Sequence, residues 1–441
     1  MSKNMINQSL LLTSLFGAFV FLQFTVLGLA NHAGEGYLTT AQRDFVYYGL
    51  QIFVILGFVL YSLFFRFCTC KRRQNAIAYG IFGLFLLCGI LLFVTGHDSL
   101  FYVIVAMTAA LCIGAVGGAA HLRMSMAIVS GMDVARFMGL GSAAAVILQY
   151  LLQIRWGVTP FLPFFMLAAF VLFLFMLRRT APQVVTEGEG KVEHVPSRRI
   201  CFSVLIASTF ILFACYYNES IHHLMIRSDY ASANVYSWPR LMMVPVYLLH
   251  AVTGDRKKGK LVPIVSLCIM LIALLNVVLI GNAGSYWLNM CFFYIVIAAY
   301  TAYYLLTFWR LAPGTRHPAL WAPFGRMLDS GMVLLTGAVN FSAFSAFVVL
   351  GVDIVGAAVV ILLMAINGDL ALAKTQTAPE LVPAGLERLP SAPEITPGKS
   401  EMPPPAPLIA SPVPKIAQAA QKAQTALTPE EIMQMDWLWD N

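Results

Sequence analysis

Long apolar runs separated by short polar breaks dominate the pattern of the chain. Runs of this length cross a hydrocarbon core of about 30 Å as helices. They are continuous rather than alternating, which disfavours a transmembrane β-barrel. The pattern therefore predicts an all-α polytopic membrane protein with twelve spans, at residues 9–30, 44–66, 76–95, 100–122, 136–154, 160–178, 200–218, 236–253, 261–280, 285–309, 324–342 and 346–366.

Composition supports a membrane protein over a soluble one. Of the 441 residues, 59% are hydrophobic and 11% are charged, whereas soluble domains carry roughly 25% charged residues. The first apolar run is longer than the core of a typical signal peptide and lacks a clear cleavage site, so we interpret it as the first span. The net charge of +7 is spread over short loops, and we expect no nucleic-acid partner.

The positive residues predict the orientation in the membrane. If the N-terminus is cytoplasmic, the inward loops hold 19 Lys and Arg residues and the outward loops hold three, Arg43, Arg155 and Arg227. Such a bias in short loops sets topology. We therefore expect a multi-pass protein of the cell (plasma or inner) membrane with both termini in the cytoplasm.

The chain divides into two halves. A polar segment at residues 179–199 separates an N-terminal six-helix bundle (1–178) from a C-terminal one (200–366), and a Pro/Ala-rich tail follows (367–441). Landmark charges recur at similar spacing: Lys71 and Lys257 lie 186 residues apart, and Arg123 and Arg310 lie 187 apart. This spacing favours parallel repeats, whose interface holds the substrate in many transporters.

The stretch "GDRKKGK" (254–260), between the eighth and ninth spans, carries a resemblance to a known family. It is similar to the loop signature of the major facilitator superfamily, and the twelve spans and 6 + 6 division agree with that family. The resemblance implies an inner gate in which Asp255 pairs with Arg310 and meets Arg136 from the other half. The residues assigned to this gate are Gly254, Asp255, Arg256, Lys257, Gly259, Lys260, Arg310 and Arg136.

The chain also departs from the family pattern. The first-half counterpart, "RFCTCKRRQNA", has no acidic residue, and "GLGSAAAVILQYLL" lacks the Gly-Pro signature of the antiporters. The stretches "YGLQIF", "HLRMSMAIVSGMDVARFMGLG" and "HPALWAPFGRM" resemble the membrane half of bacterial regulators with a LuxR-type DNA-binding domain. Only fifteen residues run from the "LTPEE" motif at Leu427 to Asn441, too few for that domain.

Polar side chains near the outer ends of spans are candidates for substrate or proton binding. In "YYNESIHHL", Glu219, His222 and His223 share one helix face if the helix continues, and they form either a proton site or a solvated helix end. Arg240 lies within the eighth span, where it can clamp a carboxylate, neutralise Glu219 or reach the interface. Further candidates to line a central cavity are Gln23, Gln51, Gln149, Asn289, Tyr294 and Asn340.

Other polar groups favour structural roles. Arg326 and Asp329 are predicted to be a gate or packing pair near the cytoplasmic end of the eleventh span. Asp353, in the last span, is expected to be structural, and the tyrosines of the tenth span (Tyr300, Tyr303 and Tyr304) are interpreted as interfacial. Cys68 and Cys70 are interpreted as structural, with lipidation or redox sensing as alternatives.

These features predict a function in transport rather than catalysis. The sequence has no nucleotide-binding loop or catalytic signature, and we expect no cofactor and no metal. The first interpretation is a secondary active transporter of a small solute, either neutral or monoanionic, with coupling to protons possible. The alternative is a transporter-like sensor that signals through its tail. We expect this tail to be disordered; alternatively, the capping box from Thr428 to Glu431 begins a short helix that docks on a protein partner or on the bilayer surface.

Overall fold

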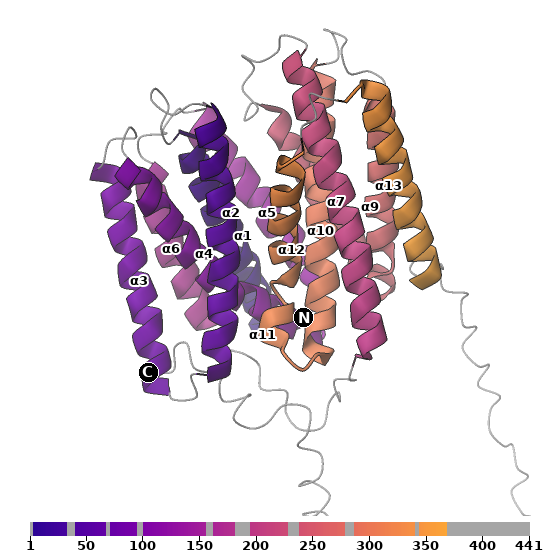
Figure 1. Ribbon diagram of the computed structural model, residues 1–441. Coiled ribbons are helices and arrows are strands. Elements are labelled where there is room, and N and C mark those ends of the chain that lie inside the picture. The colour runs from indigo at the N-terminus through magenta and orange to yellow at the C-terminus, as the bar shows by residue number, and fades with distance from the viewer. Residues whose placement is uncertain are drawn as a thin grey trace, which may run out of the picture.

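The computed structural model describes residues 3–32, 40–67, 71–94, 100–155, 162–180, 195–227, 238–277, 286–339 and 344–367. Within these ranges every regular element is helical (Figure 1). The first half contains α1 (Lys3–His32), α2 (Thr40–Phe67), α3 (Lys71–Val94), α4 (Leu100–Val129), α5 (Val134–Gln149) and α6 (Leu162–Arg179). The second half contains α7 (Ser197–Arg227), α8 (Met243–Thr253), α9 (Leu261–Val277), α10 (Tyr286–Leu311), α11 (Pro318–Trp321), α12 (Phe324–Gly337) and α13 (Ala346–Asn367).

Each of the twelve predicted spans coincides with one of these helices, so the all-α prediction is confirmed. Several helices are longer than predicted; the largest extensions at a C-terminal end are those of α4, which continues to Val129, and α7, which continues to Arg227. Helix α5 ends in a π-helical turn, Tyr150–Arg155, and α8 is preceded by a 3-10 turn, Trp238–Met242. Asn340, Cys68, Cys70 and the tail from residue 368 lie outside the described residues.

The helices pack in a pattern that repeats between the halves. In the first half α1 packs on α5 and α6, α2 on α4, and α3 on α4 and α6. In the second half the equivalent pairs are α7 with α12 and α13, α8 with α10, and α9 with α10 and α13. The two halves meet through α5 against α8 and through the equivalent pair, α2 against α12. The fold is therefore two pseudo-symmetric bundles (Figure 1).

Small residues allow close approach where the helices cross. A Cβ atom on Gly141 of α5 would lie 2.7 Å from the Thr13 carbonyl of α1. On the α8 side of the same helix, a Cβ on Gly139 would lie 2.6 Å from the Ala251 Cβ and would collide with the Tyr247 carbonyl. Membrane helices commonly pack through small residues, because lipid gives no hydrophobic drive for helices to associate. Helix α5 is thus held tightly on two sides.

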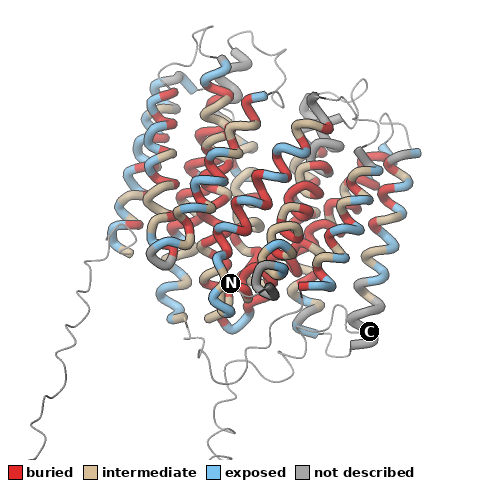
Figure 2. Tube along the Cα trace, turned by 180° about the vertical axis from the view of Figure 1, so that it is seen from behind, coloured by how far each residue is buried: buried red, intermediate tan, exposed pale blue. Residues whose placement is uncertain are grey.

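The exposed surface has the apolar character of a membrane protein. Seven of the described helices are long and apolar enough to cross a bilayer, and two shorter apolar helices lie at Tyr79–Leu92 and Leu261–Asn276. Large apolar side chains such as Leu275 (71% exposed) and Phe347 (87% exposed) cover the outer faces, while buried residues lie in the interior of the molecule, within and between the bundles (Figure 2). These faces fit a lipid environment, since soluble monomers rarely expose such contiguous apolar patches.

Candidate functional site

Asp255 connects the two halves at one end of the molecule. Its carboxylate accepts hydrogen bonds from the backbone N–H groups of Ala135 (3.1 Å) and Arg136 (3.0 Å). These groups belong to the first turn of α5, where N–H groups have no partner within the helix. Asp133, which precedes α5, makes no side-chain cap. Asp255 therefore takes the role of an N-cap for a helix of the other half.

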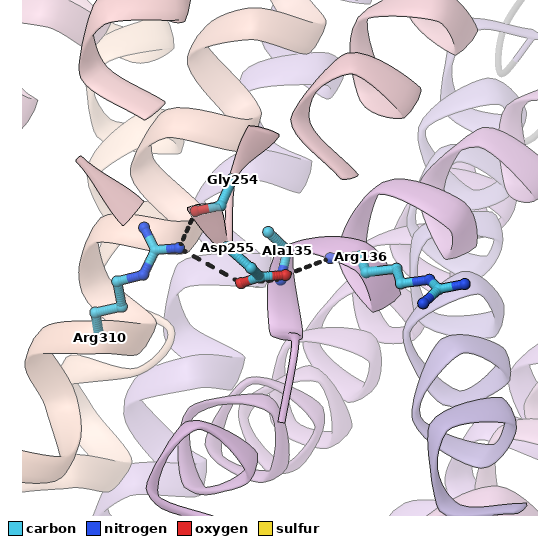
Figure 3. A network of polar contacts seen from close by, with 5 residues as sticks. All are labelled: Ala135, Arg136, Gly254, Asp255 and Arg310. Atoms are coloured by element: carbon cyan, nitrogen blue, oxygen red, sulfur yellow. Dashed lines mark hydrogen bonds and ion pairs between the residues drawn. The ribbon is translucent and has the colours of Figure 1, made fainter. Parts of the chain in front are cut away.

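Arg310, at the end of α10, fixes the turn that carries Asp255. Its Nη2 donates to the Gly254 carbonyl at 2.7 Å and lies 3.7 Å from Asp255 Oδ1 (Figure 3). Gly259 has a φ of +84°, and a Cβ there would collide with the Arg310 guanidinium. Glycine is therefore required at this position for both backbone conformation and space.

The environment of Asp255 balances burial against polar contacts. Burial raises the pKa of this carboxyl above its usual value, and the N–H groups of Ala135 and Arg136 and the charge of Arg310 partly offset that rise. The guanidinium of Arg136 points away from Asp255 (Figure 3). The contact of Asp255 with Arg136 is thus made by the Arg136 backbone N–H group. We call Ala135, Arg136, Gly254, Asp255 and Arg310 the gate contacts.

A second set of contacts between the halves joins α4 to α10. Trp309 Nε1 donates to His121 Nδ1 at 2.8 Å, and Ser125 Oγ donates to the Trp309 carbonyl at 2.9 Å. The rings of Phe16, Phe19 and Phe58 meet His121 edge-on. Trp309 and His121 are fully buried, so these contacts form a packed layer between the halves.

A cavity of about 220 Å³ lies between the two halves. Its walls come from α1, α2, α4 and α5 on one side and from α8, its preceding turn, α10 and α12 on the other. The lining residues are Phe16, Phe19, Val20, Gln23, Phe24, Tyr47, Gln51, His121, Ser142, Arg240, Met243, Tyr247, Phe293, Tyr294, Ile297, Tyr300, Thr301, Tyr304, Leu305, Arg326, Asp329 and Val333. An apolar pocket with a few converging polar groups is the usual form of a small-molecule site.

A polar network occupies the α12 wall of the cavity. Arg326 forms an ion pair with Asp329, and Tyr304 donates to Asp329 Oδ2 at 3.3 Å. With its amide oxygen turned toward α12, Gln23 of α1 accepts hydrogen bonds from Arg326. These contacts place a charged pair on the cavity wall, where the sequence predicted a gate or packing pair near the cytoplasmic end of the span.

A hydrogen bond between α2 and α12 borders the same wall. Ser330 Oγ donates to Gln51 Oε1 at 2.8 Å. Both side chains are buried. The cavity is therefore enclosed on this side by a polar contact between the halves as well as by apolar packing.

Arg240 supplies a second guanidinium to the cavity. Its side chain is 4% exposed, and its guanidinium carbon lies 4.8 Å from the centre of the Phe24 ring. Stacking of this kind is typical of arginine at aromatic walls. Arg240 is thus directed inward, toward the cavity, rather than toward the membrane surface.

Of the other residues predicted to bind substrate or line a cavity, only some reach the cavity. Gln23, Gln51 and Tyr294 line the cavity, whereas Gln149 and Asn289 are buried elsewhere in the helices. Glu219 is half-buried on α7, away from the lining, and the side chains of His222 and His223 lie outside the described set. Tyr300 and Tyr304 are buried on the cavity, so their assignment as interfacial residues is wrong.

Sequence reasoning missed His121 and Trp309. They lie beside the landmark residues Arg123 and Arg310, but they are 188 residues apart in the sequence. The equivalent positions of α4 and α10 in the two halves offered a signal, because the repeat places the ends of these helices opposite each other. That signal becomes specific only once the packing of the halves is known.

Comparisons with known proteins identify the fold. No protein-family model matches the sequence, and no curated protein is similar to it. Among solved structures, the human organic anion transporter MFSD10 (TETRAN) is similar with a TM-score of 0.53 and 13% identity, covering 81% of this chain and 98% of that one. A double-tryptophan mutant of XylE is similar with a TM-score of 0.51 and 12% identity, covering 80% and 95%.

The class of protein follows from the fold and these neighbours. The chain is a multi-pass helical membrane protein with the fold of major facilitator superfamily transporters. At this level of identity the likeness establishes the fold and leaves the solute open. The likeness to LuxR-type regulators finds no support among these neighbours.

Proposed function

We propose that the protein is a secondary active transporter that moves a small solute across the cell membrane by alternating access. The main support is the cavity between two pseudo-symmetric halves, together with contacts that join the halves at one end. Transporters of this architecture bind solute at the interface of the repeats and expose it by rocking one half against the other. The structural neighbour MFSD10 fits this class, since it is an organic anion transporter.

The gate contacts suggest which step of the cycle the structure represents. Asp255 and Arg310 lie at the end that the distribution of Lys and Arg assigns to the cytoplasm. With Asp255 bound to α5, this end is closed. The structure then corresponds to the conformation that closes the cavity to the cytoplasm, and opening requires α5 and α8 to separate there.

Flux through the purified protein tests this proposal. The full chain, reconstituted in liposomes, is given radiolabelled benzenesulfonate, glucose or tetraethylammonium, with and without an imposed proton gradient. Saturable uptake of any of these solutes above that of empty liposomes supports transport. Solute-induced thermal stabilisation without flux would instead identify a sensor that uses the same cavity.

The assigned orientation of the protein in the membrane can be tested separately. Cysteine labelling from either side of sealed vesicles reports the side to which Lys260→Cys is exposed, in a chain whose eight native cysteines are replaced. We expect reaction from the cytoplasmic side only. Reaction from the outer side would reverse the assigned orientation without changing the transport proposal.

A further inference from the structure

His121 places a hydrogen-bond donor beside the aromatic wall of the cavity. We propose that the cavity binds a small planar ring compound whose carbonyl or carboxylate oxygen accepts a hydrogen bond from the Nε2–H group of His121. This inference rests on the proposed function, since it takes the cavity to be the solute site. It extends that function from an unspecified solute to a class defined by one ring and one acceptor oxygen.

Trp309 fixes which nitrogen of His121 carries the proton. The indole N–H is a donor only, and Trp309 Nε1 lies 2.8 Å from His121 Nδ1. Nδ1 therefore accepts with its lone pair, and the proton of the ring lies on Nε2. The Ser125 hydroxyl, one turn beyond His121 on α4, donates to the Trp309 carbonyl at 2.9 Å, so the turn of α10 that carries the indole is held against α4.

The Nε2–H group of His121 has no strong acceptor. Nε2 is buried and has no hydrogen-bond partner among the residues that the structure describes. The ring centroids of Phe16, Phe19 and Phe58 lie 6.0, 5.3 and 5.5 Å from that of His121, and an aromatic face accepts an N–H only weakly. Buried donors are almost always satisfied, and an oxygen of a ligand in the cavity would complete this one.

The position of the imidazole allows a ligand to reach Nε2. His121 lines the cavity, whereas Trp309 is not among the described lining residues. Because Nδ1 faces the indole, Nε2 lies on the other edge of the imidazole ring. An oxygen that approaches from the cavity therefore does not have to displace Trp309.

The size and walls of the cavity limit the rest of the ligand. A volume of about 220 Å³ is below the roughly 300–1,000 Å³ of sites for drug-sized molecules, which favours a single ring. Phe16 and Phe19 both line the cavity and contact the His121 ring, and aromatic side chains favour a planar apolar body. A ring packed on these two side chains brings an oxygen on its first substituent atom toward His121.

Binding to the purified full-length protein tests whether the ligand needs an acceptor oxygen. Calorimetry compares acetophenone and benzoate with α-methylstyrene, which has the same skeleton but a methylene group in place of the carbonyl oxygen. We expect the oxygen compounds to bind about tenfold more tightly, because the methylene group leaves the buried Nε2–H donor unsatisfied.

The affinity of benzoate relative to that of acetophenone then distinguishes a carboxylate ligand from a neutral carbonyl ligand. If α-methylstyrene binds as tightly as both oxygen compounds, the proposal is overturned. An absence of binding of both oxygen compounds at millimolar concentration also overturns it.

Variants test the role of His121. His121→Phe keeps a ring but removes the donor, so the preference for acetophenone over α-methylstyrene should disappear, and His121→Gln, which keeps an N–H donor, should retain part of it. The control is His317→Phe, the same change at an exposed position, which should leave the preference unchanged. An undiminished preference in folded His121→Phe refutes the assignment. If His121→Phe does not fold, the three ligands measured on the parent protein still decide.

Binding and flux together separate this inference from the proposed function. Oxygen-dependent binding without flux of any probe refutes transport and leaves the ligand class intact. Saturable flux of glucose with equal binding of the three ring compounds refutes the ligand class and leaves transport intact. Trp309→Phe removes the donor that fixes the proton on Nε2, so it should reduce the preference for acetophenone more than it reduces the affinity for α-methylstyrene.

Discussion

Substitution of Gly139 by alanine tests whether the contact between α5 and α8 closes the gate. Gly139 lies about 7–8 Å along the helix axis from Val134, the residue at which α5 begins. An added Cβ there would collide with the Tyr247 carbonyl and lie 2.6 Å from the Ala251 Cβ. Backbone and Cβ atoms cannot rotate away, so the two helices must separate. We therefore expect Gly139→Ala to favour the conformation that is open at the gate.

The size of the shift toward the open conformation follows from the free-energy cost of overpacking the closed one. One extra methyl group in a well-packed contact typically costs about 1–3 kcal/mol, and this cost falls on the closed conformation alone. The gain in helix propensity, about 1 kcal/mol for alanine over glycine, applies to both conformations and cancels. The ratio of open to closed molecules should therefore rise about 5- to 140-fold, at 1.4 kcal/mol for each factor of ten.

Distance measurements between spin labels can follow this ratio. Labels at Ser130→Cys and Lys260→Cys, both exposed positions near the gate on opposite halves, report the separation at that end once the native cysteines are replaced. Gly83→Ala is the matched control, because a Cβ atom on Gly83 in helix α3 would meet nothing within 4 Å. An unchanged distance distribution in Gly139→Ala, or an equal change in Gly83→Ala, would refute the reasoning.

Three further predictions concern acidic side chains. Asp255→Ala removes the cap of α5 and should shift the ratio of open to closed molecules toward the open form by about 1 kcal/mol. The control Asp133→Ala removes a carboxylate that makes no cap, so it should leave the ratio unchanged. Equal shifts in the spin-label distances of the two variants would contradict this prediction. Burial raises the pKa of Asp255, so the closed state holds the proton more tightly than a state in which this carboxyl is exposed. Lowering the pH toward about 4 should therefore increase the closed population of the parent protein. The same change of pH should have no such effect on Asp255→Ala. Asp353 is fully buried, and neither of its carboxyl oxygens has a hydrogen-bond partner among the described residues. Asp353→Asn should therefore leave flux intact and keep or raise the melting temperature. Loss of flux in a folded variant would contradict a structural role for Asp353.

Much of the fold was predictable because lipid imposes a strong constraint on sequence. A span must be apolar over its length, so helices such as α2 and α10 are recognisable from composition alone. The end of α7 was less predictable, because Glu219, His222 and His223 continue the helix beyond the apolar run. Hydropathy detects the membrane core and says little about a helix that extends past it.

Residues of the site were predictable only where placing the side chain inside a span has an unusual energetic cost. Arg240, a charge inside a span, was recognisable for that reason, and its place on the cavity fits the cost. Arg326 and Asp329 were visible as a pair near the start of their helix, but spacing gives their helix face and not their position on the cavity wall. Tyr304 and His121 depend on which helices face each other, which sequence periodicity does not encode.

The gate is one-sided, and this asymmetry constrains the mechanism. The loop from α8 to α9 supplies Asp255 to the start of α5, whereas the equivalent stretch of the first half, "RFCTCKRRQNA", contains no acid to offer the start of α12. The symmetry-related contact between α2 and α12 instead includes the Gln51–Ser330 hydrogen bond beside the cavity. Closure on the α5 side therefore depends on the carboxyl group of Asp255, while the contact on the α12 side borders the cavity. A ligand that draws Arg326 or Gln51 toward itself would act on the second contact and leave Asp255 untouched, so solute and pH should act on the spin-label distances independently.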